Sequence, residues 1–416
     1  MAVANNVAEA VPGQLAAPTA GSADFQTAGV VTISAGHFMH DCYTAFLAPL
    51  LIVFRQTLGL SNEAAGFLSV ITQQGSLIQP LIGGAADRYG ARWFVILTPA
   101  ITGAAMSLLG LATSYWTLAI FMVVVGLSSA CLHAVGPVMI GKISGKRLGT
   151  GMSFWMVGGE SGRFVGPLVL ALALPLLTIK HTPWLMIGGL ITAVLLYFTM
   201  TDVGRSATAA IAQKPSLRAE IRGREKYVAL LIFVITITVF VSAALSTYLP
   251  LLLSGEGDSF RMATISFAVY QAAGVVGALL GGTLSDRLGR RNMLFAAMVP
   301  ASLFMFVFLA VLSGPPSLIW ARFATLMVIG FSQLSVTPVV MALVQETFPG
   351  NRALANGFYM ALSFMARSAF ILLLGWVGDQ YGLRLSFVIS AVVPLMGLPV
   401  MLLFPNKPQT TGHSAA

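Results

Sequence analysis

Residues 83–92 read GGAADRYGAR, and residues 282–291 repeat the pattern as GTLSDRLGRR. The two stretches share glycine, aspartate and arginine at matched spacing and lie about 199 residues apart. A polar motif that recurs at this distance indicates that the second half of the chain repeats the first. Parallel repeats of several helices are common in membrane proteins with many spans. The motif therefore predicts two related halves, with one copy after the second helix of each half.

The composition excludes a soluble globular protein. Of the 416 residues, 57% are hydrophobic and only 9% are charged, whereas soluble domains are about 45–50% apolar and about 25% charged. Because one helical span needs roughly 20 residues, the chain is long enough to cross a bilayer about a dozen times.

Charged residues, proline and glycine divide the apolar sequence into segments of transmembrane length. Between Arg92 and Lys142, for example, no Asp, Glu, Lys or Arg occurs, and Ser114 and Tyr115 separate two spans. We therefore expect an all-α membrane protein with twelve transmembrane helices in two pseudo-symmetric six-helix lobes. The expected helices cover residues 28–54, 61–86, 93–113, 115–141, 148–176, 182–202, 226–253, 259–285, 292–313, 316–346, 352–377 and 384–404.

Lysine and arginine are distributed asymmetrically over the connectors. The odd-numbered connectors hold only Arg55, Lys180, Arg261 and Arg384, and the even-numbered connectors hold most of the others. Cytoplasmic loops carry the excess of basic residues, so both termini are expected on the cytoplasmic side of the cell's inner membrane. The expected division is a disordered tail at 1–27, a lobe at 28–202, an inter-lobe linker at 203–225, a second lobe at 226–404 and a tail at 405–416.

The positions of the charged residues and cysteines exclude several function classes. The net charge is +9, but the basic residues lie in short connectors between apolar runs, so no nucleic-acid partner is expected. Cys42 and Cys131 lie inside apolar runs and indicate neither a disulfide framework nor a zinc site. The glycine-rich residues 274–282 lack a Walker lysine and a preceding strand. We therefore expect no nucleotide and no other cofactor.

The repeated motif resembles the cytoplasmic signature of the major facilitator superfamily. This resemblance implies a gate, in which the two aspartates cap neighbouring helices and pair with basic residues when the cytoplasmic side closes. It also implies a monomer. The gating residues would be Asp87, Arg88, Arg92, Asp286, Arg287 and Arg290.

Four further stretches of the chain resemble the fosmidomycin resistance family of proton-driven exporters. They are residues 34–41, 128–133, 157–168 and 345–352. Residues 162–167 are also similar to the antiporter signature of the fifth helix, although residues 169–170 replace its trailing glycine pair. The resemblance implies a secondary active exporter driven by an inward proton gradient.

Charged side chains at the bilayer centre cost about 2.5–3.5 kcal/mol each on insertion scales, so they need a partner or a function. On the first helix, His37, His40 and Asp41 share one face by their spacing. We expect Asp41 to carry the coupled proton, with His37 as its tuning neighbour and Glu160 as a further candidate. The alternatives are a helix-packing pair and a metal site. No further cluster in the sequence completes a metal shell, so no metal is expected.

The fifth and eleventh helices each carry an arginine at similar depth. Two guanidiniums that face one another across a cavity would suit a bidentate hold on a carboxylate, phosphate or phosphonate. The alternative is structural neutralisation, of Arg163 by Glu160 and of Arg367 by the first or seventh helix. The polar residues nearby either contact substrate or bond neighbouring helices. The expected substrate residues are Arg163, Arg367, Glu160, His40, His133, Tyr359, Gln271 and Gln333.

The sequence thus predicts a proton-coupled antiporter that exports a small organic anion or zwitterion, or a drug, by alternating access. Its partners would be the small-molecule substrate, protons and membrane lipid. Proton-coupled uptake of an anionic metabolite is the alternative direction of transport. An intramembrane enzyme is disfavoured, because no nucleophile–base pair or metal constellation is evident beyond the first helix.

Overall fold

Long apolar segments of this chain fold as helices, since a helix satisfies every backbone polar group within its own segment. The computed structural model describes residues 24–79, 81–82, 91–200, 221–222, 225–348 and 352–403, and these contain helices and turns but no strand. Ten segments of the described chain are long and apolar enough to cross a membrane. The expected all-α fold class is confirmed.

The helices follow the chain in two series. The first series is α1 (Thr27–Thr44), α2 (Leu47–Leu58), α3 (Asn62–Gln74), η1 (Gly75–Ile78), α5 (Ala91–Leu108), η2 (Leu109–Leu111), α6 (Tyr115–Ile143), η3 (Gly145–Arg147), α7 (Leu148–Ala173), η4 (Ile179–Leu185) and α8 (Met186–Thr199). The second series is α10 (Glu225–Gly255), α11 (Phe260–Leu288), α12 (Arg290–Leu312), η5 (Pro316–Leu318), α13 (Ile319–Thr347), α14 (Arg352–Tyr381) and α15 (Leu383–Met401).

Three of the expected helices are interrupted or irregular, and one of them is the helix expected at 61–86, which passes from α3 into η1 after Gln74. The helix expected at 28–54 is broken at Ala45 and Phe46 into α1 and α2. Pro49 explains the break, because its ring removes one backbone donor and clashes with the carbonyl four residues earlier. The helix expected at 182–202 starts as the tighter turns of η4. Most of the predicted tails and inter-lobe linker, together with residues 83–90, lie outside the described residues.

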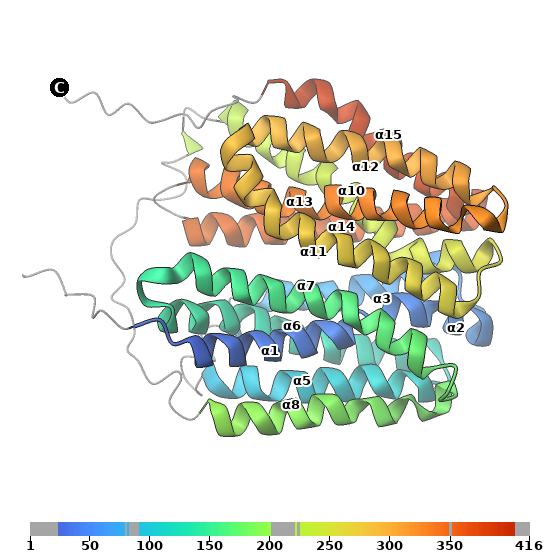
Figure 1. The fold of residues 1–416 in the computed structure, drawn as a ribbon, viewed down its shortest axis with the longest axis horizontal. Coiled ribbons are helices and arrows are strands. Elements are labelled where there is room, and N and C mark those ends of the chain that lie inside the picture. The colour runs from blue at the N-terminus through green and yellow to red at the C-terminus, as the bar shows by residue number, and fades with distance from the viewer. Residues whose placement is uncertain are drawn as a thin grey trace, which may run out of the picture.

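The two series form two groups of helices that lie side by side (Figure 1). We call α1–α8 the first lobe and α10–α15 the second lobe. Contacts between the lobes are made by α7 with α11, α3 with α14 and α2 with α10. The lobes therefore meet along helices that occupy equivalent positions in the two repeats.

The buried cores show where the lobes are joined. We call the end of the bundle near residues 27, 143 and 288 the linker end, and the end near residues 58 and 381 the far end. One core is shared by the two lobes, and it includes Leu50 of α2 and Leu251 of α10 toward the far end. Toward the linker end each lobe has its own core, around Ile140 in the first and Val344 in the second. Among the described residues, the lobes share a core at the far end and have separate cores at the linker end.

A carboxylate fastens the lobes together at the far end. Asp379 of α14 accepts hydrogen bonds from the backbone N–H groups of Asn62 (2.7 Å) and Glu63 (2.9 Å), the first residues of α3. Those N–H groups have no partner inside their own helix, and a negative charge at a helix N-terminus is favourable. At Gly375 a Cβ atom would lie 2.9 Å from Glu63 Cα, so glycine permits this close approach.

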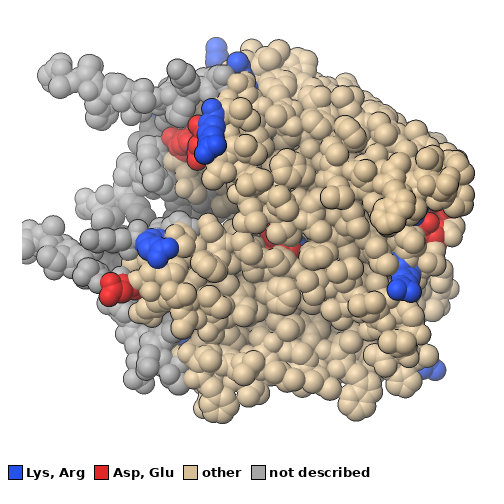
Figure 2. Space-filling view, viewed as in Figure 1, with Lys and Arg blue, Asp and Glu red and all other residues tan. Residues whose placement is uncertain are grey.

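Charged side chains are rare along the sides of the bundle. On the face in Figure 2, the charged residues lie close to the two ends of the helices, apart from a small charged spot at mid-length. The belt between them is otherwise uncharged, as the hydrocarbon core of a bilayer requires.

Candidate functional site

Helix α7 lies directly against α1 through three glycines. A Cβ atom on Gly158, Gly162 or Gly166 would come within 2.4, 2.2 and 2.1 Å, respectively, of a backbone carbonyl oxygen of α1. Small residues at four-residue spacing allow helices to approach this closely. This close packing of the glycine face brings the side chains of α7 onto the polar face of α1. The carbonyls belong to Ser34, Phe38 and Cys42.

Asp41 is at the centre of a buried charged cluster. Its side chain is 3% exposed, and its Oδ2 lies 3.0 Å from Nε of Arg163 on α7. Nε2 of His37 lies 3.4 Å from the same oxygen, and Nε2 of His40 lies 3.8 Å from Oδ1. The structure thus brings together the predicted face of α1, and it adds an arginine from another helix.

The hydrogen bonds of two imidazoles fix which nitrogen carries the proton. Nδ1 of His37 lies 2.9 Å from the carbonyl oxygen of Trp155, and Nδ1 of His133 lies 2.9 Å from the carbonyl oxygen of Ser129. A carbonyl only accepts, so both Nδ1 atoms donate. In the neutral tautomer, Nε2 of His37 then presents a lone pair toward Asp41, and two acceptors face one another. A bound proton between them would resolve this opposition.

His133 of α6 completes a group that could be considered for a metal ion. Each of three residues offers one possible ligand atom, and these three atoms lie within 4.8 Å of one another; the residues are His37, Asp41 and His133. However, the Arg163 guanidinium already lies 3.0 Å from the Asp41 carboxylate. A divalent cation in this low-dielectric site would meet that fixed positive charge at short range. The residues present therefore suit a proton better than a metal ion.

Arg163 also contacts a second carboxylate. Its Nη1 lies 3.1 Å from Oε1 of Glu160, one turn earlier on α7. Oε2 of Glu160 is buried and accepts no hydrogen bond from the described residues. The Arg163 side chain is 41% exposed and that of Glu160 is 13% exposed, so this pair lies further from the core than Asp41. Arg163 therefore bridges two acidic groups, one on α1 and one on its own helix.

Arg367 of α14 brings a second guanidinium from the other lobe. It donates a hydrogen bond of 2.5 Å to Oγ of Ser246 on α10, while its Nε is buried without a partner. No carboxylate of the described residues forms an ion pair with it. Arg367, Arg163 and Glu160 interact electrostatically with one another and with Tyr270 of α11. The two lobes thus place opposed arginines around one central region.

The other predicted substrate residues lie in varied settings. Gln333 donates to the carbonyl of Thr238 (3.0 Å), so its amide bonds a neighbouring helix of its own lobe. Gln271 is buried, and Tyr359 packs in the linker-end core of the second lobe. A polar bridge between the lobes joins two residues that are 294 positions apart, and no local sequence pattern indicates such a pairing. Nε2 of Gln74 donates to Oγ of Ser368 at 3.4 Å.

The predicted gating residues are described in part. In the second lobe, Arg290 pairs with Asp286 (2.6 Å) and with Glu346 of α13 (2.7 Å), while Arg287 is exposed. In the first lobe, Arg92 donates to the carbonyl of Tyr197 and lies over its ring. These contacts stay within one lobe, in agreement with lobes that are separate at the linker end. Asp87 and Arg88 lie outside the described residues.

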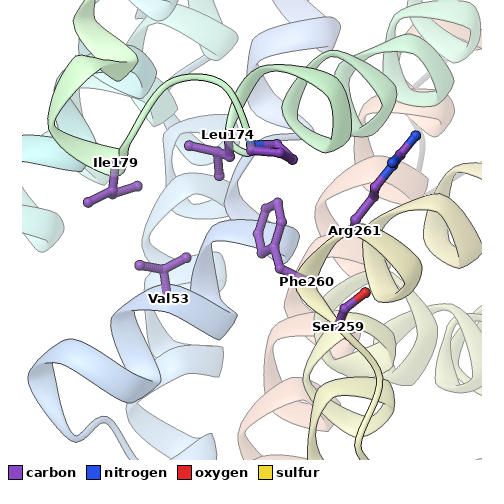
Figure 3. Close-up of a pocket in the computed structure, with 7 residues that line it drawn as sticks. Val53, Leu174, Ile179, Ser259, Phe260 and Arg261 are labelled. Carbon is purple, nitrogen blue, oxygen red and sulfur yellow. The ribbon is translucent and has the colours of Figure 1, made fainter.

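A separate cavity lies between the lobes at the far end. It has a volume of about 310 Å³. Phe260 of α11 and Leu174 approach one another across it, and Arg261 lies at its edge (Figure 3). Leu174 is about three helical turns from Arg163. The cavity is therefore distinct from the charged cluster, and most of its lining is apolar. Its remaining lining residues are Val53, Pro175, Ile179 and Ser259.

Comparison with known proteins decides the family. The sequence model of the Major Facilitator Superfamily matches residues 33–331 and 259–416. The chain belongs to the major facilitator superfamily. It is therefore a multi-pass membrane transporter for a small molecule and not an enzyme.

Relatives in sequence include proteins named for drug resistance. The chain is 24% identical to the fosmidomycin resistance protein of Escherichia coli (strain K12) over 405 residues, which cover 95% of this chain and 97% of that protein. It is also 24% identical to the multidrug resistance protein MdtG of Serratia proteamaculans (strain 568), over 86% of this chain and 89% of that protein. The expected resemblance to both the superfamily and the fosmidomycin resistance family is confirmed.

Solved structures of the superfamily share this fold. A bacterial homologue of the lysosomal transporter Spinster, inward-facing and occupied, superposes with a TM-score of 0.73 at 14% identity, covering 91% of this chain and 96% of that chain. A D-xylose–proton symporter gives a TM-score of 0.71 at 16% identity, covering 92% and 99%. At these identities the likeness establishes the fold alone.

Proposed function

We propose that the chain is a proton-coupled antiporter that exports a small organic anion or zwitterion by alternating access. One observation carries the proposal: Arg163 and Arg367 reach one central region from opposite lobes, and Arg367 lacks a carboxylate partner among the described residues. An unpaired charge near the middle of a membrane is costly unless a ligand or a partner neutralises it. The names of the drug-resistance relatives support export.

The substrate would bind between the two arginines. A guanidinium holds a carboxylate, phosphate or phosphonate through two parallel hydrogen bonds, and Arg163 retains 41% exposure of its side chain for such a contact. Because the two arginines belong to different lobes, a substrate that bridges them would draw the lobes together. Binding energy would then be coupled to the change of access.

Asp41 would carry the coupled proton. The carboxylate is 3% exposed and is surrounded by imidazoles of α1 and α6. Nε2 of His37, at 3.4 Å, is placed to share a proton with it. The imidazole gives the proton a second site beside the carboxylate, so the two groups can pass it between them.

The lobe arrangement supports a state that faces the cytoplasm. The excess of basic residues on the even-numbered connectors supports a cytoplasmic location for the linker end and, with it, for both termini, because cytoplasmic loops carry the excess of lysine and arginine. The lobes are separate at that end and share a core at the far end. Alternating access would close the linker end through the gating residues and open the far end.

Thermal stabilisation tests the substrate site. The purified protein would be heated with a panel of phosphonates, organic acids, cationic drugs and sugars, since a ligand that binds only the folded state raises the midpoint. We expect stabilisation by anions or zwitterions that is lost in Arg163→Gln and in Arg367→Gln but is retained in a control, Arg261→Gln, at the exposed far end. Stabilisation that persists in both variants would overturn the two-arginine site.

Transport in proteoliposomes tests the proton carrier. Asp41→Asn should abolish transport driven by a pH gradient and should preserve exchange driven by substrate on the opposite side. Driven transport at the wild-type rate in this variant would exclude Asp41 as the carrier.

A further inference from the structure

We propose that Arg163 transmits the occupancy of the proton site to the substrate site by moving between Asp41 and Glu160. An exported substrate must then be a zwitterion, with a cationic group for Glu160 and an anionic group for Arg367. This inference rests on the proposed function and deepens it, because it names the charge pattern of the substrate and the residue that sets the sign of coupling.

The geometry gives Arg163 two competing partners. Its Nε lies 3.0 Å from Oδ2 of Asp41, and its Nη1 lies 3.1 Å from Oε1 of Glu160. A small rotation of one guanidinium is therefore enough to strengthen either contact at the expense of the other. Oε2 of Glu160 has no hydrogen-bond partner among the described residues. Glu160 is thus a carboxylate with capacity left for a cationic ligand.

The charges around Asp41 balance only in one protonation state. Asp41 and Glu160 supply two negative charges, and Arg163 and Arg367 supply two positive charges, so the cluster is neutral when its imidazoles are neutral. A proton on the pair of Asp41 and His37 makes the cluster positive and removes the attraction between Asp41 and Arg163. The other titratable groups that face the cluster are His40 of α1, His133 of α6 and Tyr270 of α11.

The proton then determines whether Glu160 is available. When Asp41 is protonated, Glu160 is the remaining carboxylate partner of Arg163, and the arginine neutralises it. When Asp41 is ionised, it shares Arg163 with Glu160, and Oε2 of Glu160, which has no hydrogen-bond partner among the described residues, can bind an ammonium group of the substrate. A proton and an ammonium group therefore exclude each other, although their sites lie on different helices.

An antiporter needs its proton and its substrate to exclude each other. This effect is reciprocal by thermodynamic linkage: if a bound proton weakens substrate binding, substrate binding must expel a proton. A zwitterion satisfies this condition through its ammonium group. A plain anion behaves in the opposite way, because protonation of Asp41 frees Arg163 to bind it. The same site would then bind proton and anion together, as a symporter does.

Proton release on binding tests the inference. The full-length protein in weakly buffered detergent solution would be mixed with aminomethylphosphonate or with methylphosphonate, which lacks the ammonium group, while a pH dye and calorimetry record protons and heat. Protonation of the probes themselves is removed by subtracting the signal of Asp41→Asn. We expect aminomethylphosphonate to release up to about one proton per chain, and methylphosphonate to cause uptake.

Variants of Glu160 test whether the released protons depend on the movement of Arg163 between Asp41 and Glu160, which we call the relay. Glu160→Gln should lose the release caused by aminomethylphosphonate and keep the uptake caused by methylphosphonate, which also shows that the variant is folded. Glu160→Asp, which keeps the charge, should retain the release. Release that is unchanged in Glu160→Gln, or uptake with both probes in the wild-type protein, would overturn the relay.

Other results are expected if the proposed function itself, proton-coupled antiport of a small organic anion or zwitterion, is wrong. Heat of binding without any pH change would show that binding is not coupled to protons, and a response that is equal in Asp41→Asn would place the proton site elsewhere. Binding of neither probe would overturn the substrate class and the relay with it.

Discussion

Replacing Asp379 by asparagine should weaken the contact between the lobes at the far end without destabilising the fold of either lobe. Both carboxylate oxygens of Asp379 accept backbone N–H groups of α3, from Asn62 at 2.7 Å and from Glu63 at 2.9 Å. Asparagine has the same shape, but its side chain carries no charge and offers only one oxygen as an acceptor. Its NH₂ group would face a backbone N–H of α3, so two donors would oppose each other. These bonds cross between lobes, so only the state that is joined at the far end loses them.

The size of the effect follows from the two bonds. A hydrogen bond to a charged group contributes about 1.5–3 kcal/mol, and a negative charge at a helix N-terminus contributes about 0.3–1 kcal/mol. Loss of one bond and of the charge should therefore cost about 2 kcal/mol. Since about 1.4 kcal/mol is tenfold in an equilibrium constant, the population should shift roughly 30-fold toward the state that is open at the far end.

Distances between spin labels would measure the shift. Labels at Gln56 and Tyr381, which are both exposed near the far end, would be placed in a chain whose cysteines Cys42 and Cys131 have been replaced. In the parent protein we expect one short distance, and in Asp379→Asn a second, longer distance should appear, with its population relative to the short one raised roughly 30-fold.

A cap inside one lobe provides the control. Oγ of Ser61 accepts the backbone N–H of Ala64 at 3.1 Å, at the same end of α3. Ser61→Ala should lower thermal stability by about 0.5–2 kcal/mol and leave the distance distribution unchanged. The reasoning would be refuted if Asp379→Asn left the ratio of the two populations unchanged, or if Ser61→Ala shifted that ratio equally.

Three further substitutions have expected outcomes. Gly66→Ala should also favour opening at the far end, measured with the same labels, because its Cβ would lie 1.9 Å from Oη of Tyr248 in the other lobe. Gly162→Ala should lower the unfolding temperature, since a Cβ 2.2 Å from a carbonyl of α1 overpacks the α1–α7 contact by roughly 1–3 kcal/mol. Arg322→Gln should destabilise the folded protein by roughly 1–3 kcal/mol, because Asp258, 3.0 Å away, loses its charged partner. An unchanged unfolding temperature in Gly162→Ala or in Arg322→Gln would contradict the prediction for that variant.

The candidate site was foreseen in the parts that depend on one helix. Helical spacing placed His37 and Asp41 on one face, and it placed Glu160 within reach of Arg163 on α7, where the structure has them. Glu160 contacts Arg163, as the structural alternative expected, and Asp41 shares the same guanidinium. Whether Arg163 and Arg367 bind substrate stays a prediction.

The sequence by itself determined the all-α class, the two related halves, most of the helices and the glycine face of α7. These follow from local causes: an apolar segment in a bilayer must satisfy its backbone as a helix, and residues three or four apart share a face.

Only the tertiary structure decided which faces meet. It paired Arg163 with Asp41, added His133 to the cluster, and brought Asp379 to the start of α3, across 317 residues of sequence. The rotation of each helix about its axis depends on many weak packing contacts summed over the whole interface. No short stretch of sequence contains that sum, so these pairings required the folded molecule.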